Sequence, residues 1–473
     1  MHVSRRILFG RLVALQDIDH LAAAELGKAA KLSLAEGDHS EERWRLYTSR
    51  ASQLVGDLNF QEASRIASAF SAARYVEFPL FAKLSARALE CLPKPIDDDD
   101  DKKEQAAVSA GDLRQMALAC GRAQCFDGDL MEAMVPLIEE RLQDFRPKEL
   151  VQIADAYARL PVQSPELFAL VAEVLPRYLY DLRPPELATL CRSFAEVALY
   201  NEELSDALAA EVEKRARSFG AMECLIFLDG LSRLHEGMDE DLRVIRKERD
   251  AAVIAAVADQ LSGSASSLAA AELVRGFSAL VRLDYYEPRL VHGRICTALA
   301  LKFDELLQGG RGVGPPAFAR PQQASRGFTA LADLLHCLSL LPAQSHKSME
   351  LTASTSQAMT QLLAQLLAGH EEDLERRGAT PRDATASVGR LPDPRSVAVA
   401  VLAVAQLGRV EQEEELMKHL TQCVIGPKNP AFLALASEEE LKDLQGAFEL
   451  CNAMEVHEVI AAELERREPS RPV

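Results

Sequence analysis

Four stretches of this chain resemble one another at a constant spacing of 37 residues, and that spacing limits the fold more than any other feature. They begin at Asp112, Glu149, Glu186 and Glu223. Self-similarity with a period between about 20 and 50 residues is typical of proteins built from stacked repeats. We therefore expect an all-α fold, an α-solenoid of about nine helical hairpins with a repeat of ~37 residues.

Each repeat predicts two helices, and we number its positions from the acidic residue, position 0. Position 1 is Leu or Cys, position 7 is small and position 8 is large, as in Leu150, Ala156 and Tyr157. These positions follow one face at the helical period, so the first helix is expected to begin at the acid. The small residue at position 7 is expected to let a neighbouring helix approach closely.

The second helix of each repeat is marked by a leucine at position 18, such as Leu130 and Leu167. Asp127, Ser164, Asn201 and Asp239 precede these helices and are expected to cap them. Pro147, Pro184 and Pro185 predict a tight turn just before the next first helix.

The 473 residues divide into four segments by this pattern. Residues 1–58 predict a targeting-like segment with capping helices, and 59–308 the regular hairpins, including flanking repeats at Glu62 and Glu272. A Gly/Pro-rich linker is expected at 309–327, and degenerate helical repeats at 328–473 with a charged loop at 371–394. Strand signals are nearly absent; even Val397 to Val404 fits the helical template better.

Charge and cysteine usage narrow the class of protein. The net charge of −19 lowers the expectation of nucleic-acid binding, which usually shows a basic footprint. Nine cysteines without a Cys-x-x-Cys pair indicate buried thiols in a reducing compartment. No apolar run reaches the ~20 residues of a membrane span. Met1 to Ala14 carries three arginines and no acid, which resembles a mitochondrial targeting segment.

Patterns that carry catalysis or metal binding are missing from the sequence. Gly309 to Gly314 is glycine-rich but lacks the Lys-Ser/Thr pair of a phosphate-binding loop. His336 and Cys337 are adjacent and therefore point to different sides of a helix, and His457-Glu458 lacks a second histidine. We expect no enzyme activity, no cofactor, no metal and no small-molecule substrate.

The best candidate for function is a row of polar side chains at positions 3 and 10 of the first helices, the polar row. The two positions lie two turns apart and share one side of the helix. The row contains Arg65, Gln115, Arg122, Gln152, Arg159, Thr189, Arg233, Arg275 and Arg282, interrupted by Glu196 and Ile226. Arginine can pair with phosphates, whereas Gln and Thr can read base edges. The alternative is that these residues pair with the abundant acids of the chain itself.

The amino-acid sequence of the repeat resembles a known class of organellar proteins. Phe145-Arg146-Pro147-Lys148-Glu149-Leu150 through Tyr157-Ala158-Arg159-Leu160 is similar to the heptatricopeptide/octotricopeptide repeats, which are helical hairpins of 37–38 residues often followed by a RAP domain. The resemblance covers residues 60–310 well and 396–460 loosely, and Glu440 to Val473 predicts helix rather than a RAP domain. It implies RNA and mitochondria or plastids.

The resemblance favours a structural component of the mitochondrial ribosome, located in the matrix, that contacts rRNA and ribosomal proteins. In that hypothesis Arg122, Arg159, Arg233 and Arg282 touch RNA phosphates. A protein-only scaffold of a mitochondrial complex is the alternative, and it predicts that the polar row is neutralised by Glu and Asp. A cytoplasmic adaptor of HEAT or armadillo type is a third interpretation, and acidic runs such as Glu139-Glu140 and Glu202-Glu203 could face basic partners in any of them.

Overall fold

The regular structure of this chain is helical throughout the part that the computed structural model describes. That part comprises residues 12–93, 108–124, 127–161, 164–307, 321–342, 345–377, 391–425 and 430–467, and no strand occurs within these ranges. The segment Val397 to Val404 lies inside a helix, and the chain from 438 to 467 forms two helices joined by a turn at 451–453. The predicted all-α fold built from helical hairpins is confirmed.

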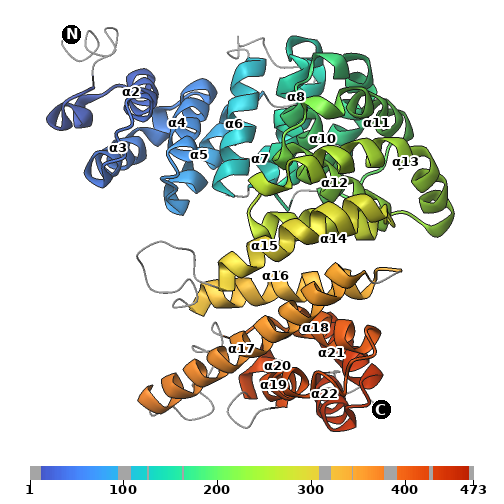
Figure 1. The fold of residues 1–473 in the computed structure, drawn as a ribbon. Helices are drawn as coiled ribbons and strands as arrows, with labels where there is room; N and C mark the ends of the chain where they lie inside the picture. The colour runs from blue at the N-terminus through green and yellow to red at the C-terminus, as the bar shows by residue number, and fades with distance from the viewer. Residues whose placement is uncertain are drawn as a thin grey trace, which may run out of the picture. The chain divides into compact units, whose positions relative to one another are not determined.

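The chain forms two units, Met1–Arg215 with Arg233–Arg246 and Ala216–Ser232 with Lys247–Val473. Residues of α12 (Ala221–Glu236) and α13 (Glu240–Gly263) contribute to both. The first unit otherwise contains η1 (Leu15–His20), α2 (Ala23–Ala35), α3 (Glu41–Leu54), η2 (Val55–Asp57), α4 (Phe60–Ala72), α5 (Phe78–Cys91), α6 (Ala110–Ala123), α7 (Gly128–Glu140), η3 (Leu142–Asp144), α8 (Pro147–Ala158), α9 (Pro165–Val174), η4 (Leu175–Asp181), α10 (Pro184–Glu196) and α11 (Glu202–Arg215) (Figure 1).

The second unit continues the same alternation of first and second helices. It contains η5 (Ala216–Ser218), η6 (Ala265–Ser267), α14 (Ala270–Arg282), the π-helical η7 (Arg289–Ile295), α15 (Cys296–Leu307), α16 (Pro321–Ser339), α17 (His346–Arg377), α18 (Pro394–Gln406), α19 (Glu414–Ile425), α20 (Pro430–Leu435), α21 (Glu438–Leu450) and α22 (Met454–Arg467). The described helices pair into ten hairpins, from α2–α3 to α21–α22, compared with about nine expected.

Within each unit the hairpins stack in two layers, which is the arrangement of an α-solenoid. In the first unit α2, α4, α6, α8 and α10 pack on one another in order, and α3, α5, α7, α9 and α11 form the second layer. In the second unit α14, α16, α18 and α21 form one layer, while α15, α17, α19 and α22 form the other. Each helix therefore buries its apolar face against its neighbours in the stack.

The residues that the repeat predicts for the core are buried. Position 8 supplies Phe70, Tyr157, Phe194 and Leu280, each at most 4 % exposed. The Tyr157 hydroxyl donates to the carbonyl of Met131 at 2.8 Å, and burial raises the pKa of Tyr157, which keeps the hydroxyl protonated. The buried hydroxyl of Tyr157 is thus satisfied by a carbonyl on the second helix of the preceding hairpin.

The acid at position 0 lies inside the first turn of its helix, so the prediction that the helix begins at the acid was wrong by two residues. Glu62, Glu149 and Glu186 occupy the third helical position, and their carboxylates accept the backbone N–H of the N-cap residue. Pro147 and Pro184 are the first helical residues rather than parts of a preceding turn. The acid repeats because its carboxylate accepts the N–H of the N-cap residue, which is one half of a capping box and satisfies an otherwise unpaired group; the second half is present at Asn59.

Caps of the second helices follow the sequence prediction at three of four sites. The side chains of Asp127, Asn201 and Asp239 accept the N–H groups of Leu130, Leu204 and Leu242 at 2.8–3.2 Å. Ser164 precedes α9 but makes no capping hydrogen bond with its side chain. Pro165 is the first residue of α9, where its missing N–H costs nothing.

A left-handed residue ends the first helix in seven of the ten hairpins. In each case it lies at position 12, where the third helical residue is position 0. The seven residues have φ between 48° and 71° and are Gly37, Arg74, Gln124, Ala198, Asp284, Gly408 and Asn452. In six of them the next residue donates its N–H to the carbonyl of position 8, as from Leu199 to Phe194 at 3.1 Å. This arrangement is a Schellman motif, which satisfies carbonyl groups at the helix end.

Small residues bring consecutive first helices close together, as position 7 predicts. A Cβ atom on Gly121 of α6 would lie 2.8 Å from Cα and 2.9 Å from the carbonyl oxygen of Ala156 on α8. Ala156 is the residue at position 7 of its repeat. The two backbones therefore meet at a point where only glycine fits.

Arginines on second helices close three hairpins of the first unit. Arg50, Arg87 and Arg215 donate to the carbonyls of Leu21, Leu58 and Leu182 at 2.8–2.9 Å. Each acceptor lies four residues before position 0 of its own repeat. The bond ties the end of the second helix to the residue just before the N-cap of the first helix, whose carbonyl lies outside the helix.

The segment boundaries differ from the sequence prediction in three places. The hairpin α2–α3 has the same features as the other repeats: Glu25 closes its capping arrangement, Gly37 ends its first helix, and Glu25 precedes Glu62 by 37 residues. The linker expected at 309–327 is shorter, since α16 begins at Pro321, and residues 371–377 of the expected charged loop belong to α17. Residues 1–11, the Asp97–Asp101 run, 308–320 and 378–390 lie outside the described residues.

Candidate functional site

The polar row lies on the first helices, as predicted, and the helices place its members at different levels of exposure. Arg65 is on α4, Gln115 and Arg122 are on α6, and Gln152 is on α8, with Arg159 at its C-terminal cap. Arg233 is on α12, and Arg275 and Arg282 are on α14. Arg122, Arg159 and Arg275 are exposed, whereas the other members are half-buried.

Asp229 binds two arginines of the row. Its carboxylate is 7 % exposed and accepts hydrogen bonds from Arg275 and Arg282, each at 2.9 Å. These arginines occupy positions 3 and 10 of α14, so the prediction that the two positions share one side of the helix is confirmed here. The shared carboxylate removes much of the positive potential that an external anion would need.

Asp155, two repeats earlier in the sequence, also binds two arginines, one from its own repeat and one from the next first helix. Its carboxylate accepts Arg159 of its own repeat at 2.8 Å and Arg192 of α10 at 2.5 Å. Asp155 and Asp229 both occupy position 6 of their repeats, a column that the sequence analysis did not consider. The periodic spacing of the two aspartates was the available signal.

Arg233 is engaged as well, by the acid that interrupts the row. It pairs with Glu196 of α10 at 2.8 Å, exactly one repeat earlier in the numbering, and both side chains are about 40 % exposed. The pair joins position 10 of successive first helices. Exposed pairs of this kind contribute little stability, about 0–1 kcal/mol, but they neutralise charge locally.

The two glutamines of the row also have partners. Gln152 accepts a hydrogen bond from Arg114 at 2.8 Å, and Arg114 lies 3.5 Å from the Glu149 carboxylate. Gln115 accepts a hydrogen bond from the ammonium group of Lys31 at 3.0 Å. Lys31 and Arg114 therefore belong to this face, although the sequence analysis missed both of them.

Arg65 and Arg122 differ from the other arginines of the row. Neither forms an ion pair with any residue that the structure describes. The Cβ atom of Arg65 lies 3.1 Å from where a Cβ on Gly27 would be, so its stem packs against α2. The row is thus neutralised on α8, α12 and α14 but retains unpaired cations on α4 and α6.

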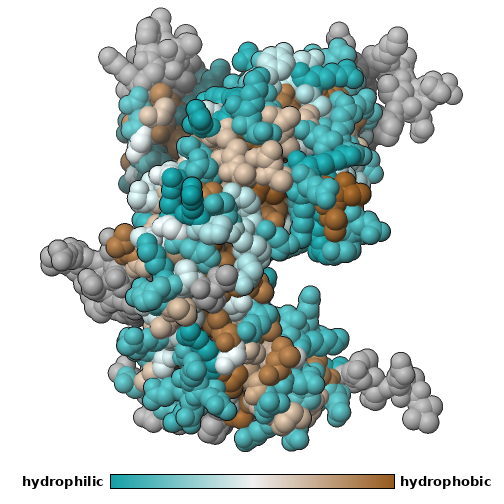
Figure 2. Space-filling model, turned by 45° about the vertical axis from the view of Figure 1, so that its right-hand side comes forward, coloured by the Kyte–Doolittle hydropathy of each residue, from teal (hydrophilic) through white to brown (hydrophobic). Residues whose placement is uncertain are grey.

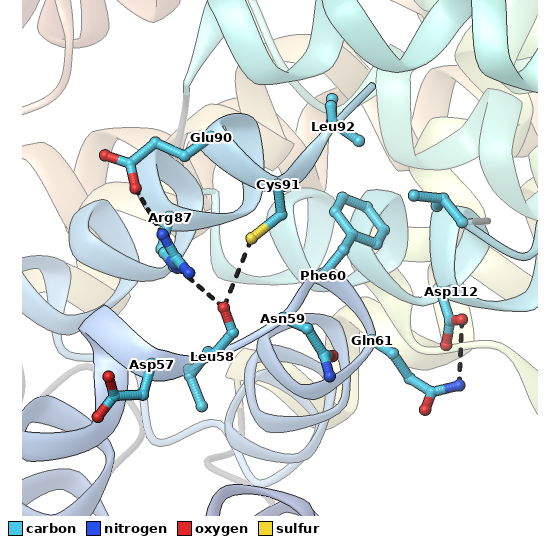
Figure 3. A pocket seen from close by; sticks show the side chains of 11 residues that line it. Asp57, Leu58, Asn59, Phe60, Gln61, Arg87, Glu90, Cys91, Leu92 and Asp112 are labelled. Carbon is cyan, nitrogen blue, oxygen red and sulfur yellow. Dashed lines mark hydrogen bonds and ion pairs between the residues drawn. The ribbon is translucent and has the colours of Figure 1, made fainter. Parts of the chain in front are cut away.

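Two pockets of the first unit are lined by residues that the structure describes. One, of about 460 Å³, is lined by Asn59, Gln61, Arg87, Cys91, Asp112 and neighbouring residues (Figure 3). The Cys91 thiol and Arg87 both donate to the carbonyl of Leu58, and burial raises the pKa of Cys91, so the thiol is protonated at neutral pH. These side chains serve the hairpin closure described above.

The other pocket, of about 980 Å³, lies beside the second helices. It is lined by Glu139, Glu140, Glu173, Arg177, Tyr178 and residues between them. Glu139 and Glu140 are exposed at the end of α7, and Glu202 and Glu203 are exposed at the start of α11. These acidic side chains on the second helices are thus open to solvent, and Glu140 also lies 3.9 Å from the guanidinium of Arg141.

Cysteines, histidines and acids form no metal site within the described part of the chain. No group of three or more potential ligands comes together there. Seven of the eight cysteines in these ranges are buried and none forms a disulfide, as the sequence analysis expected; Cys125 lies outside them. Among the same residues, no helix combines the length and apolar character needed to cross a bilayer.

Comparisons with known proteins give no family for this chain. No family model matches it, and no curated protein matches it. Among solved structures, it is similar to a circular tandem repeat protein with novel repeat topology and enhanced subunit contact surfaces, with 17 % sequence identity, coverage of 96 % of both chains and a TM-score of 0.25. A likeness at that score carries no argument about function, which must come from the surfaces themselves.

Proposed function

We propose that this chain is a structural helical-repeat subunit of a large organellar assembly and that it binds basic protein neighbours through its second helices. The observation that carries the proposal is the contrast between its two faces. Arginines on α8, α10, α12 and α14 are paired with the chain's own carboxylates at 2.5–2.9 Å, whereas Glu139, Glu140 and Glu203 are exposed and the nearest cation to Glu140 is its neighbour Arg141 at 3.9 Å. Exposed carboxylates attract partners of opposite charge.

The mitochondrial ribosome is the assembly that the sequence resemblance favours. Its proteins are basic as a class, because they bind rRNA, so an acidic face of this chain would suit them. The net charge of −19 agrees with a subunit that contacts proteins over most of its surface. Direct contact of Arg159, Arg233 and Arg282 with rRNA is less favoured, since each would first have to release a carboxylate.

Sedimentation of the tagged full chain tests this proposal. We expect the chain from a mitochondrial lysate to sediment with a large assembly and, after ribonuclease treatment, to remain cross-linked to basic proteins. Glu139→Lys with Glu140→Lys should reduce those cross-links, and it should not harm folding, because lysine is favourable at a helix C-terminus. Asp19→Lys with Glu36→Lys, two exposed acids in η1 and at the end of α2, is the control with the same charge change.

Two results would contradict the proposal. One is sedimentation of the full chain as a free protein with or without ribonuclease. The other is an equal effect of the two charge reversals on the cross-links, which would indicate that net charge rather than the second-helix face determines binding.

A further inference from the structure

We propose that the first three hairpins bind the phosphodiester backbone of single-stranded RNA through Lys31, Arg65 and Arg114. These three residues and their neighbours Lys28 and Arg122 form the amino-terminal basic patch. This inference rests on the proposed membership of an organellar assembly that contains RNA, and it assigns the RNA contact to a different part of the chain from most of the polar row.

The patch is built across three consecutive first helices. The hydrogen bond from Lys31 on α2 to Gln115 on α6 reaches past α4, which packs between them, so the side chains of the three helices share one surface. Arg65 lies on α4 with its stem against Gly27 of α2. Arg114 is adjacent to Gln115, and Arg122 follows Gln115 by two helical turns on the same side of α6.

Positive charges are close enough in this patch to affect one another. Burial lowers the pKa of Lys31, and the guanidinium groups of Arg65 and Arg114 lower it further. Asp112 opposes that effect, but it is 5 % exposed and is already hydrogen-bonded to Ser109 and Gln61. Glu149 lies beside Arg114 alone. An incoming phosphate would relieve the repulsion between the cations.

The character of the surface favours RNA over an acidic protein. None of the large hydrophobic residues that are exposed in the described chain lies on α2, α4 or α6. A protein interface usually has an apolar centre, whereas an interface with nucleic acid is more polar and more positively charged. On the face drawn in Figure 2, hydrophobic residues form small, separate patches within a hydrophilic surface. Arginine forks and a lysine ammonium group are suited to phosphate oxygens.

Fluorescence anisotropy with the purified full chain and a labelled uridine oligonucleotide tests the proposal. The test variant combines Lys31→Gln, Arg65→Gln and Arg122→Gln; Arg114 is retained because it bonds Gln152. The control combines Lys83→Gln, Lys148→Gln and Arg177→Gln, which removes three exposed cations elsewhere. We expect the test variant to lose about tenfold or more in affinity for the RNA. The slope of log affinity against log salt concentration should become shallower by about two, since each of the three phosphate contacts contributes about 0.7.

The control variant should bind within about twofold of the unaltered chain, and all three proteins should share one circular-dichroism melting curve. Equal loss in the two variants, or no RNA binding by the unaltered chain, would overturn the proposal. So would competition by polyglutamate as effective as competition by unlabelled RNA, because it would assign the patch to an acidic protein. Sedimentation with a large assembly tests the proposed subunit role by a separate measurement, so its failure can be distinguished from a failure of RNA binding by the amino-terminal basic patch.

Discussion

Single residues at repeated positions set the spacing between helices and determine which arginines are paired. The sequence predicted the buried residues at positions 1, 7 and 8, because burial at the helical period is visible in any one repeat. It did not predict that Asp155 and Asp229 neutralise the polar row. An aspartate reveals its partners only when the neighbouring helix is in place, and Arg192 and Arg275 come from the next first helix in each case.

The close approach at Gly121 gives a prediction at this scale. Gly121→Ala should destabilise the first unit by about 1–3 kcal/mol, because its Cβ would meet backbone atoms of Ala156 that cannot move independently. Gly446→Ala is the control: Gly446 lies inside α21 with nothing within 4 Å of an added Cβ, and it should gain up to about 1 kcal/mol from helix propensity.

Thermal melting by circular dichroism measures both variants, and hydrogen exchange of α6 and α8 shows where the first one acts. Unchanged protection of these two helices in Gly121→Ala would mean that the helices can separate at little cost, and the argument from close packing would be wrong.

At the scale of the helical element, the hairpin is defined by its two ends. The sequence located each first helix but placed its start at the acid, because the acid is the residue that recurs most regularly. Its role at the third helical position, where it accepts the N–H of the N-cap residue, depends on backbone geometry. The sequence predicts a cap for α2–α3 because its residues diverge from the repeat pattern. The turn at Gly37 and the acceptor role of Glu25, together with the 37 residues between Glu25 and Glu62, identify it as a repeat.

The left-handed position at the end of the first helix gives a matched pair of substitutions. Ala198 has φ of 51°, which costs an L-residue about 1–2 kcal/mol, so Ala198→Gly should stabilise α10 by about 1 kcal/mol. Gly408 occupies the equivalent position after α18 with φ of 63° and open space around it, so Gly408→Ala should destabilise by a similar amount. Chemical denaturation measures both. Changes of the same sign would show that the backbone conformation does not govern these turns.

At the scale of the whole molecule, the chain consists of hairpins that depend on their neighbours. The sequence predicted this organisation and nearly the right number of hairpins, because periodicity is a property of the chain itself. It did not predict that the chain divides within the α12–α13 hairpin rather than at the glycine-rich segment, since the repeat pattern continues across that division from Glu223 to Glu272. It also could not separate paired from unpaired arginines.

Buried cysteines spread along the chain allow that dependence to be measured. Burial raises the pKa of Cys224, Cys337 and Cys423 to about 12, so alkylation of the folded chain should be slow. In a stack, a terminal hairpin has fewer neighbours to hold it. With increasing urea, we expect iodoacetamide to label Cys423 of α19 before Cys191 and Cys224, as measured by mass spectrometry of the peptides. Labelling of all buried thiols at one urea concentration would show a single cooperative unit.

The fixed turn at position 12 has a practical consequence for anyone who modifies this protein. That turn is held by hydrogen bonds between residues at a fixed separation in the sequence, so an epitope or fluorescent domain inserted there would break the hairpin. The chain itself carries its additional length on the opposite edge, between a second helix and the next first helix, as α20 does between α19 and α21. Reporter fusions belong on that edge.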